Sequence, residues 1–362
     1  MNLALVSKLR CPGCESPTLA SRAFEELDGG ICRDGVLVCG HCRSWFPISD
    51  FLLDLLPEQH CDWESRRAFS RKHRGDLTAL GLGEPKPTPG SPAPGFERQA
   101  EQQSFFDTLA QRGHRFSYER FGALVFWRAQ DALTFDGWRP LVEPGSLVLD
   151  VGCGNGRTSF KLADLGPRIL GFDVSYRLVR QAIDEAISRR ILGRVGFFVA
   201  DAHRFPVVDE AVDGVLLYGV LHHVPNPRRA LHEGARVLRD GGCYLGNENN
   251  RTPFRRGFEW MMRLRPLWLE QAGAEPLIAA ADMERWAQGS GLTLEMRTSV
   301  FIPPHICNRL PVNAARRLLR WSDRLLGNLP FVNQWGGLLV IQGRKRSLAQ
   351  LGPKGPSQSP GG

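Results

Sequence analysis

Three alternating glycines that follow a carboxylate have the clearest chemical meaning in this chain. Residues 147–157 read Leu-Val-Leu-Asp-Val-Gly-Cys-Gly-Asn-Gly-Arg, an apolar strand pattern that enters a glycine-rich turn and then a helix. Asp150 precedes Gly152, Gly154 and Gly156. This layout is typical of a nucleoside-binding βαβ unit. A dinucleotide-binding motif would have its third glycine at position 157, where this chain has an arginine. The spacing therefore disfavours a ligand with a pyrophosphate group.

Two further carboxylates end the apolar segments that follow. Asp173 closes a second predicted strand, where it would accept hydrogen bonds from ribose hydroxyls. A third predicted strand leads into Asp201 and Ala202, placed to meet an adenine amine. The alternating glycines lack a Cβ and let the turn pass close beneath a ligand with a methionine end in place of a pyrophosphate. Together these residues predict a site for S-adenosylmethionine.

A fourth apolar segment supplies candidate bases. Residues 213–224 bring Tyr218 to the cofactor site, and then His222 and His223 to its mouth. Residues 229–242 predict an amphipathic helix stopped by a glycine pair, before a fifth strand that leads into Glu248. The histidine pair either lines the cofactor or removes a proton from the methyl acceptor. Glu248 is either a second candidate base or a group that binds backbone amides of the turn.

In this order of motifs the chain resembles the class I S-adenosylmethionine-dependent methyltransferases, in particular the group that includes the ubiquinone and menaquinone biosynthesis methyltransferases. The resemblance covers roughly residues 97–345 and is most specific through residue 249. It implies an α/β fold with a Rossmann-like sheet of seven strands and helices on both faces. Residues 292–296 and 337–342 would be the last two strands, antiparallel at the sheet edge.

Four cysteines in two pairs indicate a structural metal site. Cys11 and Cys14 form one CxxC turn, and Cys39 and Cys42 form another. Two such turns can close the tetrahedral coordination of Zn²⁺, which leaves no open position for catalysis. Nine cysteines in a chain without an export signal argue against a disulfide framework.

The segment Arg43 to Pro57 resembles the end of the small zinc-ribbon activator subunit that partners several tRNA, rRNA and release-factor methyltransferases. The resemblance implies a stabilising or substrate-presenting module over residues 1–58. We expect the methyltransferase domain at 97–345 to bind the cofactor without this module. Residues 59–96 are expected to connect the two and to end in a proline-rich linker. Residues 346–362, rich in Gly, Pro, Ser and Gln, predict a disordered tail.

The composition and net charge of the chain indicate where the protein is located and which partners it can bind. Hydrophobic residues make up 42% of the chain, which is ordinary for a soluble globular protein. No apolar run reaches the length of a membrane span, so a cytoplasmic location is expected. The net charge of +8 is compatible with contact to RNA or to anionic lipid. The oligomeric state cannot be predicted from these features.

The sequence excludes some classes of methyl acceptor and leaves others open. Methyltransferases of base amines and of glutamine amides carry an Asn/Asp-Pro-Pro-aromatic loop after the fourth strand, and this chain lacks that loop. Oxygen, carbon and ring-nitrogen acceptors remain. An aromatic lid over residues 97–138 favours a small or lipid-like acceptor. An arginine stripe at Arg316, Arg320 and Arg324 suits either peripheral membrane contact or a phosphate-bearing substrate. The alternatives are an RNA-modifying methyltransferase, or a catalytically silent interaction protein.

Overall fold

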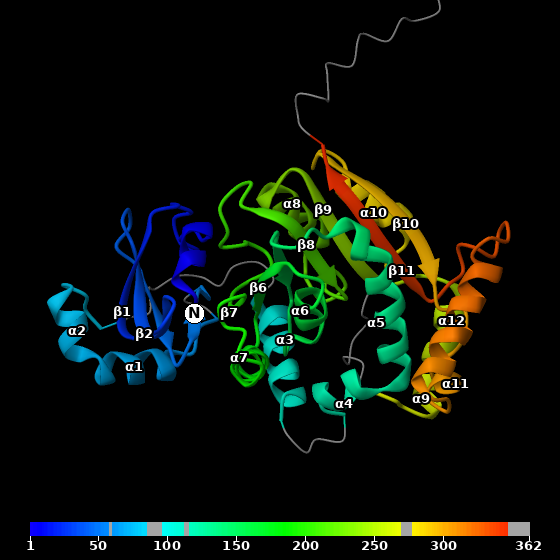
Figure 1. Cartoon of the computed structure of the whole chain (residues 1–362), viewed down its shortest axis with the longest axis horizontal. Helices are drawn as coiled ribbons and strands as arrows, with labels where there is room; N and C mark the ends of the chain where they lie inside the picture. The colour runs from blue at the N-terminus through cyan, green and yellow to red at the C-terminus, as the bar shows by residue number, and fades with distance from the viewer. Residues whose placement is uncertain (58–59, 85–95, 112–115, 269–276, 347–362) are drawn as a thin grey trace, which may run out of the picture.

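One mixed sheet runs through the molecule. The computed structural model describes residues 1–57, 60–84, 96–111, 116–268 and 277–346. Within them the sheet has eleven strands in the order β1-β2-β3-β4-β7-β6-β5-β8-β9-β11-β10. It extends from the N-terminal hairpin at one end of the molecule to the last two strands at the other (Figure 1). The architecture is therefore mixed α/β.

Five parallel strands form the centre of the sheet. Every residue of β5 and β7 is buried, as expected of strands covered on both faces. Because the carboxyl ends of parallel strands meet at one edge, the residues after these strands gather there. The five strands are β5 (Leu147–Val151), β6 (Arg168–Asp173), β7 (Val195–Val199), β8 (Val212–Tyr218) and β9 (Leu238–Asn249).

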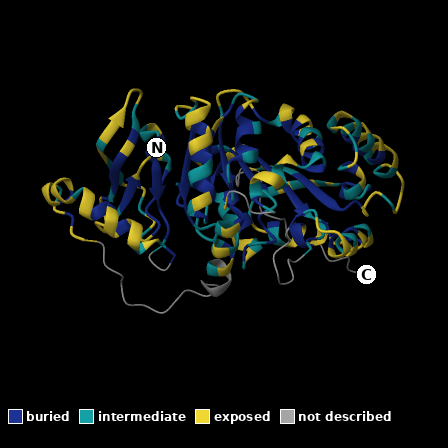
Figure 2. Cartoon of the chain, turned by 90° about the horizontal axis from the view of Figure 1, so that it is seen from below, coloured by how far each residue is buried: buried dark blue, intermediate teal, exposed yellow. Residues whose placement is uncertain are grey.

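Helices cover both faces of the central strands. Leu149 and Val151 of β5 pack in one apolar cluster with α8 and α10, whereas Val148 packs in another with α5, α6 and α7. The alternation follows from the two-residue period of a strand. Figure 2 shows the buried strands between helices whose outer sides are exposed. The helices after the N-terminal region are α3 (Phe96–Leu109), α4 (Tyr118–Ala123), α5 (Val125–Trp138), η2 (Arg139–Leu141), α6 (Arg157–Ala163), α7 (Tyr176–Ser188), α8 (Pro227–Val237), α9 (Pro253–Leu264), α10 (Ala280–Ala287), α11 (Pro304–Cys307) and α12 (Val312–Leu326).

The far edge of the sheet is antiparallel. β11 (Leu338–Lys345) lies between β9 and β10 (Leu292–Ser299) and runs antiparallel to both. These two strands include residues 292–296 and 338–342 of the predicted pair. Since β11 is antiparallel to both of its neighbours, β10 runs in the same direction as the central strands.

The N-terminal region differs from the expected separate domain before a seven-stranded sheet. Its last strand, β4, pairs in parallel with β7, with Leu53 opposite Phe198 and Asp54 opposite Val199. The physical reason is that β7 would otherwise be an edge strand with unpaired backbone groups, which the apolar β4 satisfies. The N-terminal elements are η1 (Leu3–Lys8), β1 (Leu19–Leu27), β2 (Ile31–Cys39), β3 (Trp45–Ser49), β4 (Leu52–Asp54), α1 (Trp63–Lys72) and α2 (Arg74–Ala79).

Two of the predicted segments, the linker and the tail, cannot be compared in full with the structure. Most of the proline-rich linker, residues 85–95, and most of the predicted tail, residues 347–362, lie outside the described residues. Within the described part of the chain, no helix combines the length and the apolar character needed to cross a membrane.

Candidate active site

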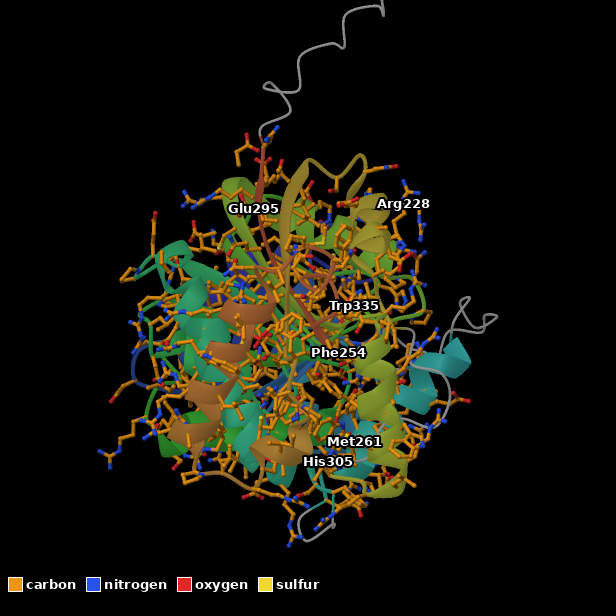
Figure 3. The ribbon with its side chains drawn as sticks, turned by 90° about the vertical axis from the view of Figure 1, so that its right-hand side faces the viewer. Arg228, Phe254, Met261, Glu295, His305 and Trp335 are labelled. Atoms are coloured by element: carbon orange, nitrogen blue, oxygen red, sulfur yellow. The ribbon has the colours of Figure 1, made fainter. Side chains whose placement is uncertain are left out.

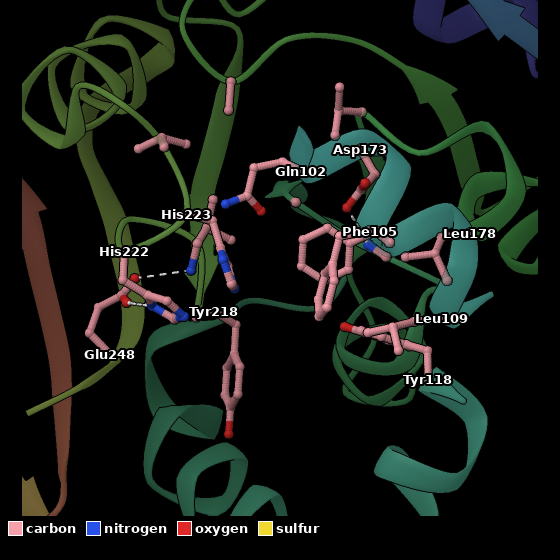
Figure 4. A pocket seen from close by; sticks show the side chains of 18 of the residues that line it. Gln102, Phe105, Leu109, Tyr118, Asp173, Leu178, Tyr218, His222, His223 and Glu248 are labelled. Carbon is pink, nitrogen blue, oxygen red and sulfur yellow. Dashed lines mark hydrogen bonds and ion pairs between the residues drawn. The ribbon is translucent and has the colours of Figure 1, made fainter. Parts of the chain in front are cut away.

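A pocket opens at the carboxyl edge of the central strands (Figure 4). Its floor comes from the turns after β5, β6, β7 and β8 and from the end of β9, and α3, α4 and α5 cover it. The predicted aromatic lid over residues 97–138 contributes to the wall, although Phe126 and Trp138 pack in the core instead. The lid aromatics that line the pocket are Phe105, Phe106, Phe116, Tyr118, Phe121 and Trp127.

The glycine turn requires glycine for two reasons. Gly152 and Gly154 have φ of +68° and +53°, in the left-handed region that other residues rarely adopt. A Cβ at Gly152 would lie 2.6 Å from a Val220 methyl carbon, and one at Gly154 would lie 2.8 Å from the Tyr118 hydroxyl. Both glycines line the pocket. Gly156 instead caps α6 and is not among the residues that line the pocket.

Asp150 lies behind the turn and does not line the pocket. Its side chain is buried and accepts hydrogen bonds from the hydroxyls of Thr158 (3.0 Å) and Ser159 (2.6 Å). Its Oδ1 has no hydrogen-bond partner among the described residues. Burial raises the pKa of Asp150 to about 7. The structure therefore places this predicted cofactor residue as a support of the turn.

Asp173 lines the pocket at the end of β6. One carboxylate oxygen accepts a hydrogen bond from the Gly154 amide and the other from the Ser175 amide, each at 2.9 Å. Burial raises the pKa of this carboxyl above its ordinary value. Each carboxylate oxygen has a second lone pair, so the group can still accept hydrogen bonds from two vicinal hydroxyls.

Asp201 and Ala202 line the pocket beside Asp173, at the loop after β7. Asp201 accepts hydrogen bonds from the backbone amide of His203 at 2.7 Å and pairs with the ring Nδ1 of the same histidine at 2.9 Å. His203 also lines the pocket. Sequence reasoning missed His203, although its place two residues after the carboxylate was a usable signal.

Tyr218 lines the pocket, but its hydroxyl is already engaged. It donates a 2.8 Å hydrogen bond to Asp131, a buried residue of α5 that also pairs with Arg157 and Lys161. Burial works against the ionised carboxyl, yet the charges of Arg157 and Lys161 hold the pKa of Asp131 below its ordinary value. Figure 4 shows the Tyr218 hydroxyl directed away from the histidine pair. Tyr218 therefore offers its ring to the pocket.

The arginine after the glycine turn is enclosed by aromatic rings. The Arg157 guanidinium lies 5.5 Å from the ring centres of Phe121 and Tyr218 and 5.7 Å from that of Trp127. Such contacts stabilise a buried cation. The sequence showed Arg157 only as a departure from a dinucleotide motif, and nothing in it linked this residue to Asp131.

His222 and Glu248 form a buried pair on the wall opposite α3. Glu248 Oε2 lies 2.6 Å from His222 Nδ1, and Oε1 accepts hydrogen bonds from the amides of Val220 (3.1 Å) and Leu221 (2.8 Å). The His223 ring lies 4.0 Å from the His222 ring and meets Phe106 edge-on at 5.2 Å. All three predicted residues line the pocket and are labelled in Figure 4.

The two CxxC turns converge at the N-terminal end of the molecule. The sulfur atoms of Cys11, Cys14, Cys39 and Cys42 all lie within 4.8 Å of one another. Cys11 lies 3.7 Å from Cys42, and Cys14 lies 3.6 Å from Cys39. A tetrahedron with metal–sulfur bonds of about 2.3 Å has sulfur atoms about 3.8 Å apart, so the cluster fits one zinc ion. All nine cysteines are free of disulfides.

Known proteins resemble the part of the chain that carries the pocket. Residues 149–245 match a family described as a methyltransferase domain. The 27-O-demethylrifamycin SV methyltransferase of Amycolatopsis mediterranei is 32% identical over 43% of this chain and 57% of its own length. The demethylmenaquinone methyltransferase of Renibacterium salmoninarum is 30% identical over 43% of this chain and 68% of its own length.

The extent of these matches varies. The chain spans little more than half the length of the rifamycin enzyme and about two thirds of the demethylmenaquinone enzyme. Among solved structures, the complex of the Haloferax volcanii Trm112 methyltransferase activator with a methyltransferase aligns with a TM-score of 0.46 and 21% identity, over 67% of this chain and 98% of the other.

Proposed function

Because the chain belongs to the S-adenosylmethionine-dependent methyltransferases, we propose that it methylates an oxygen or carbon atom of a small or lipid-like acceptor. The name of the 27-O-demethylrifamycin SV methyltransferase refers to a methyl group on oxygen, which supports an oxygen acceptor. The aromatic rings of the lid offer a flat or apolar molecule extensive contact.

The observation that carries the proposal is the His222–Glu248 pair. An ionised carboxylate only accepts hydrogen bonds, so the 2.6 Å contact assigns the proton of neutral His222 to Nδ1. Nε2 is then the basic nitrogen. The two amides that hold Glu248 fix the carboxylate and with it the imidazole. Glu248 thus acts as a positioning residue, and His222 is the general base.

The other pocket residues would bind different parts of the cofactor. When bound, S-adenosylmethionine supplies an electrophilic methyl group. Asp173 would hold its ribose, the loop at Asp201 and Ala202 its adenine, and the turn at Gly152 and Gly154 its methionine end. His222 Nε2 takes the proton that leaves the acceptor hydroxyl, or the acidic carbon, as the methyl group arrives. The aromatic lid excludes water from the reacting groups.

The alternative of an RNA-modifying enzyme needs the zinc ribbon and the basic helices, including the arginine stripe of α12, to hold phosphates. Arg316 and Arg320 both pair with Asp136 of α5, so two of the three cations are engaged within the protein. This engagement leaves them less able to neutralise phosphates. We therefore favour the small or lipid-like acceptor.

We further propose that the cysteine cluster holds one structural zinc ion. Four thiolates complete its coordination, so the metal supports the fold of the N-terminal region and takes no part in methyl transfer.

The test of this function is methyl transfer from labelled S-adenosylmethionine to phenols, naphthols, long-chain phenolic lipids and RNA. We expect transfer to the phenolic compounds, with kcat of His222→Gln lower by about 100-fold or more while cofactor affinity is kept. The loss should shrink for phenols acidic enough to be ionised without a base. His305→Gln, which alters an exposed contact to the Arg265 carbonyl, is the matched control. Transfer to RNA alone, or an active His222→Gln enzyme at every phenol pKa, would overturn the proposal.

A further inference from the structure

The C-terminal half of the molecule concentrates its exposed apolar side chains at one end. Ten large hydrophobic residues are exposed in the described part of the chain, and eight of them lie between residues 260 and 335. They include Trp260 and Leu264 of α9, Trp321 and Leu325 of α12, and Phe331 and Trp335 in the segment that follows. Phe331 is 79% exposed and Leu264 is 67% exposed, so these are prominent surface groups. We name this region the α9/α12 face.

Two helices of this face carry the same short pattern. In α9 the residues Arg256, Trp260, Arg263 and Leu264 follow the spacing Arg-x3-Trp-x2-Arg-Leu. In α12 the residues Arg317, Trp321, Arg324 and Leu325 repeat it. All eight side chains are exposed. Because positions i, i+4 and i+7 share one side of a helix, each helix presents a tryptophan flanked by two arginines.

The two helices turn their other sides to a shared core. Phe258 and Met262 of α9 pack in the same apolar cluster as Ala315 and Leu319 of α12. Figure 3 shows both helices at the end of the molecule that faces the viewer, with the labelled Met261 and His305 in this region. The outer sides of the two helices therefore belong to one end of the protein.

The charge of this face is positive. None of Arg256, Arg263, Arg317 and Arg324 forms an ion pair with a described residue. The acidic residues of the two helices are used elsewhere, since Glu259 pairs with the buried Arg255, and Asp323 accepts hydrogen bonds from Ser299 and Val300. The face therefore combines unpaired arginines with exposed tryptophan and leucine.

We propose that the α9/α12 face docks on an anionic phospholipid bilayer. Tryptophan prefers the boundary between lipid and water, and arginine can pair with headgroup phosphates while its aliphatic stem lies along apolar surface. A helix with basic and apolar residues on its outer side is suited to lie in that boundary. An anionic protein partner or nucleic acid would use the arginines, but would give less reason for eight exposed apolar side chains.

The position of α9 relates this surface to the pocket. Arg255, one residue before the outward Arg256, lines the pocket, as does Trp268 after the end of the helix. An acceptor dissolved in the bilayer would thus meet the pocket wall beside the docked helix. This last step rests on the proposed function, whereas the docking itself does not.

The experiment is co-sedimentation of the full chain with vesicles of phosphatidylcholine alone and with vesicles that also contain phosphatidylglycerol. We expect binding to the anionic vesicles. The Trp260→Ala/Trp321→Ala variant should bind them at least about tenfold more weakly. The Arg263→Gln/Arg324→Gln variant should lose most of the preference for anionic vesicles. The matched control is Leu27→Ala/Ile187→Ala, which removes the two exposed hydrophobic residues outside the face.

The outcomes separate this proposal from the proposed function. Failure of the parent chain to bind anionic vesicles, or equal binding by the tryptophan variant and the control, would refute the docking surface. Preferential, steeply salt-dependent binding of single-stranded RNA would refute it as well. Methylation of a water-soluble phenol without vesicles reports on the active site alone, and the tryptophan variant should keep it. Vesicle binding without any methylation would contradict only the proposed function.

Discussion

The two carboxylates that flank the glycine turn have different roles because only one of them faces the pocket. Asp173 lines the cavity and keeps lone pairs available, whereas Asp150 supports the turn from behind. Both residues are buried acids on neighbouring strands, and both were predicted to bind the cofactor. Their substitutions should therefore give distinct results.

Replacement of Asp173 by alanine should weaken S-adenosylmethionine binding by roughly 1.5 to 3 kcal/mol, because it removes hydrogen bonds to a charged group. Isothermal titration of the parent and variant proteins measures the difference. Asp184→Ala, at an exposed position of α7, is the control and should bind as the parent does. Equal affinity of Asp173→Ala and the control would show that the ribose contact is assigned to the wrong residue.

Replacement of Asp150 by asparagine should change how stability depends on pH. Burial raises the folded-state pKa of Asp150 to about 7 from its ordinary value of 3.8. Folding therefore favours the protonated carboxyl group. The contribution of this group to the free energy of unfolding is fully present below about pH 4 and is lost as the pH rises through 7. Thermal unfolding between pH 5 and 9 should show Asp150→Asn gaining stability relative to the parent with rising pH, by up to a few kcal/mol. A constant difference across this range would contradict the assigned environment.

The sequence could predict which residues reach the edge of the sheet, because a strand pattern followed by a polar residue places that residue at the carboxyl end. It could not show that the Tyr218 hydroxyl is bound to Asp131, since the two residues are 87 positions apart and no local pattern joins them. The sequence likewise could not show that His222 contacts Glu248, because the two residues belong to separate motifs.

Backbone contacts join the first cysteine turn to the loop that follows β7. Leu9 forms a β-bridge with Val207, and the Arg10 amide donates a hydrogen bond to the Pro206 carbonyl. Arg204 donates to the carbonyl of Pro12, inside the turn itself. These contacts begin directly after the pocket residues at 201–203, so the cysteine cluster and this part of the pocket share one support.

Removal of the metal should therefore weaken cofactor binding as well as the N-terminal fold. We expect Cys39→Ser to lose its single zinc ion and to bind S-adenosylmethionine several-fold more weakly, as measured by metal analysis and by titration. Cys61→Ser changes a cysteine outside the cluster and should keep both properties. Zinc loss with unchanged cofactor affinity would show that the loop after β7 is held by other contacts.

The continuous sheet of the molecule joins two regions that were predicted from the sequence to be separate. The fold of the catalytic region could be anticipated from its ordered motifs. The pairing of β4 with β7 could not, because Leu52-Leu-Asp54 looks like any short apolar strand and its partner lies about 145 positions further along the chain. The expected independence of the two regions rested on the proline-rich segment between them.

A chain that begins at residue 97 should accordingly be impaired, because it exposes the backbone edge of β7. We expect this fragment to aggregate and to bind S-adenosylmethionine more weakly than the full chain, as measured by size-exclusion chromatography and titration. A chain that ends at residue 346 is the control, since it keeps every strand of the sheet. A monomeric fragment with the affinity of the full chain would show that β4 is dispensable.

The same strand pairing sets an order of events during synthesis. Leu53 leaves the ribosome about 145 residues before Phe198, its partner in the sheet. At about 5 to 20 residues per second, β4 waits on the order of 7 to 30 seconds for the strand beside which it will lie. The cysteine turns are complete by residue 42 and can take up metal during that interval. The nascent N-terminal region therefore presents an open strand edge, and its folding is completed only when the middle of the catalytic region emerges.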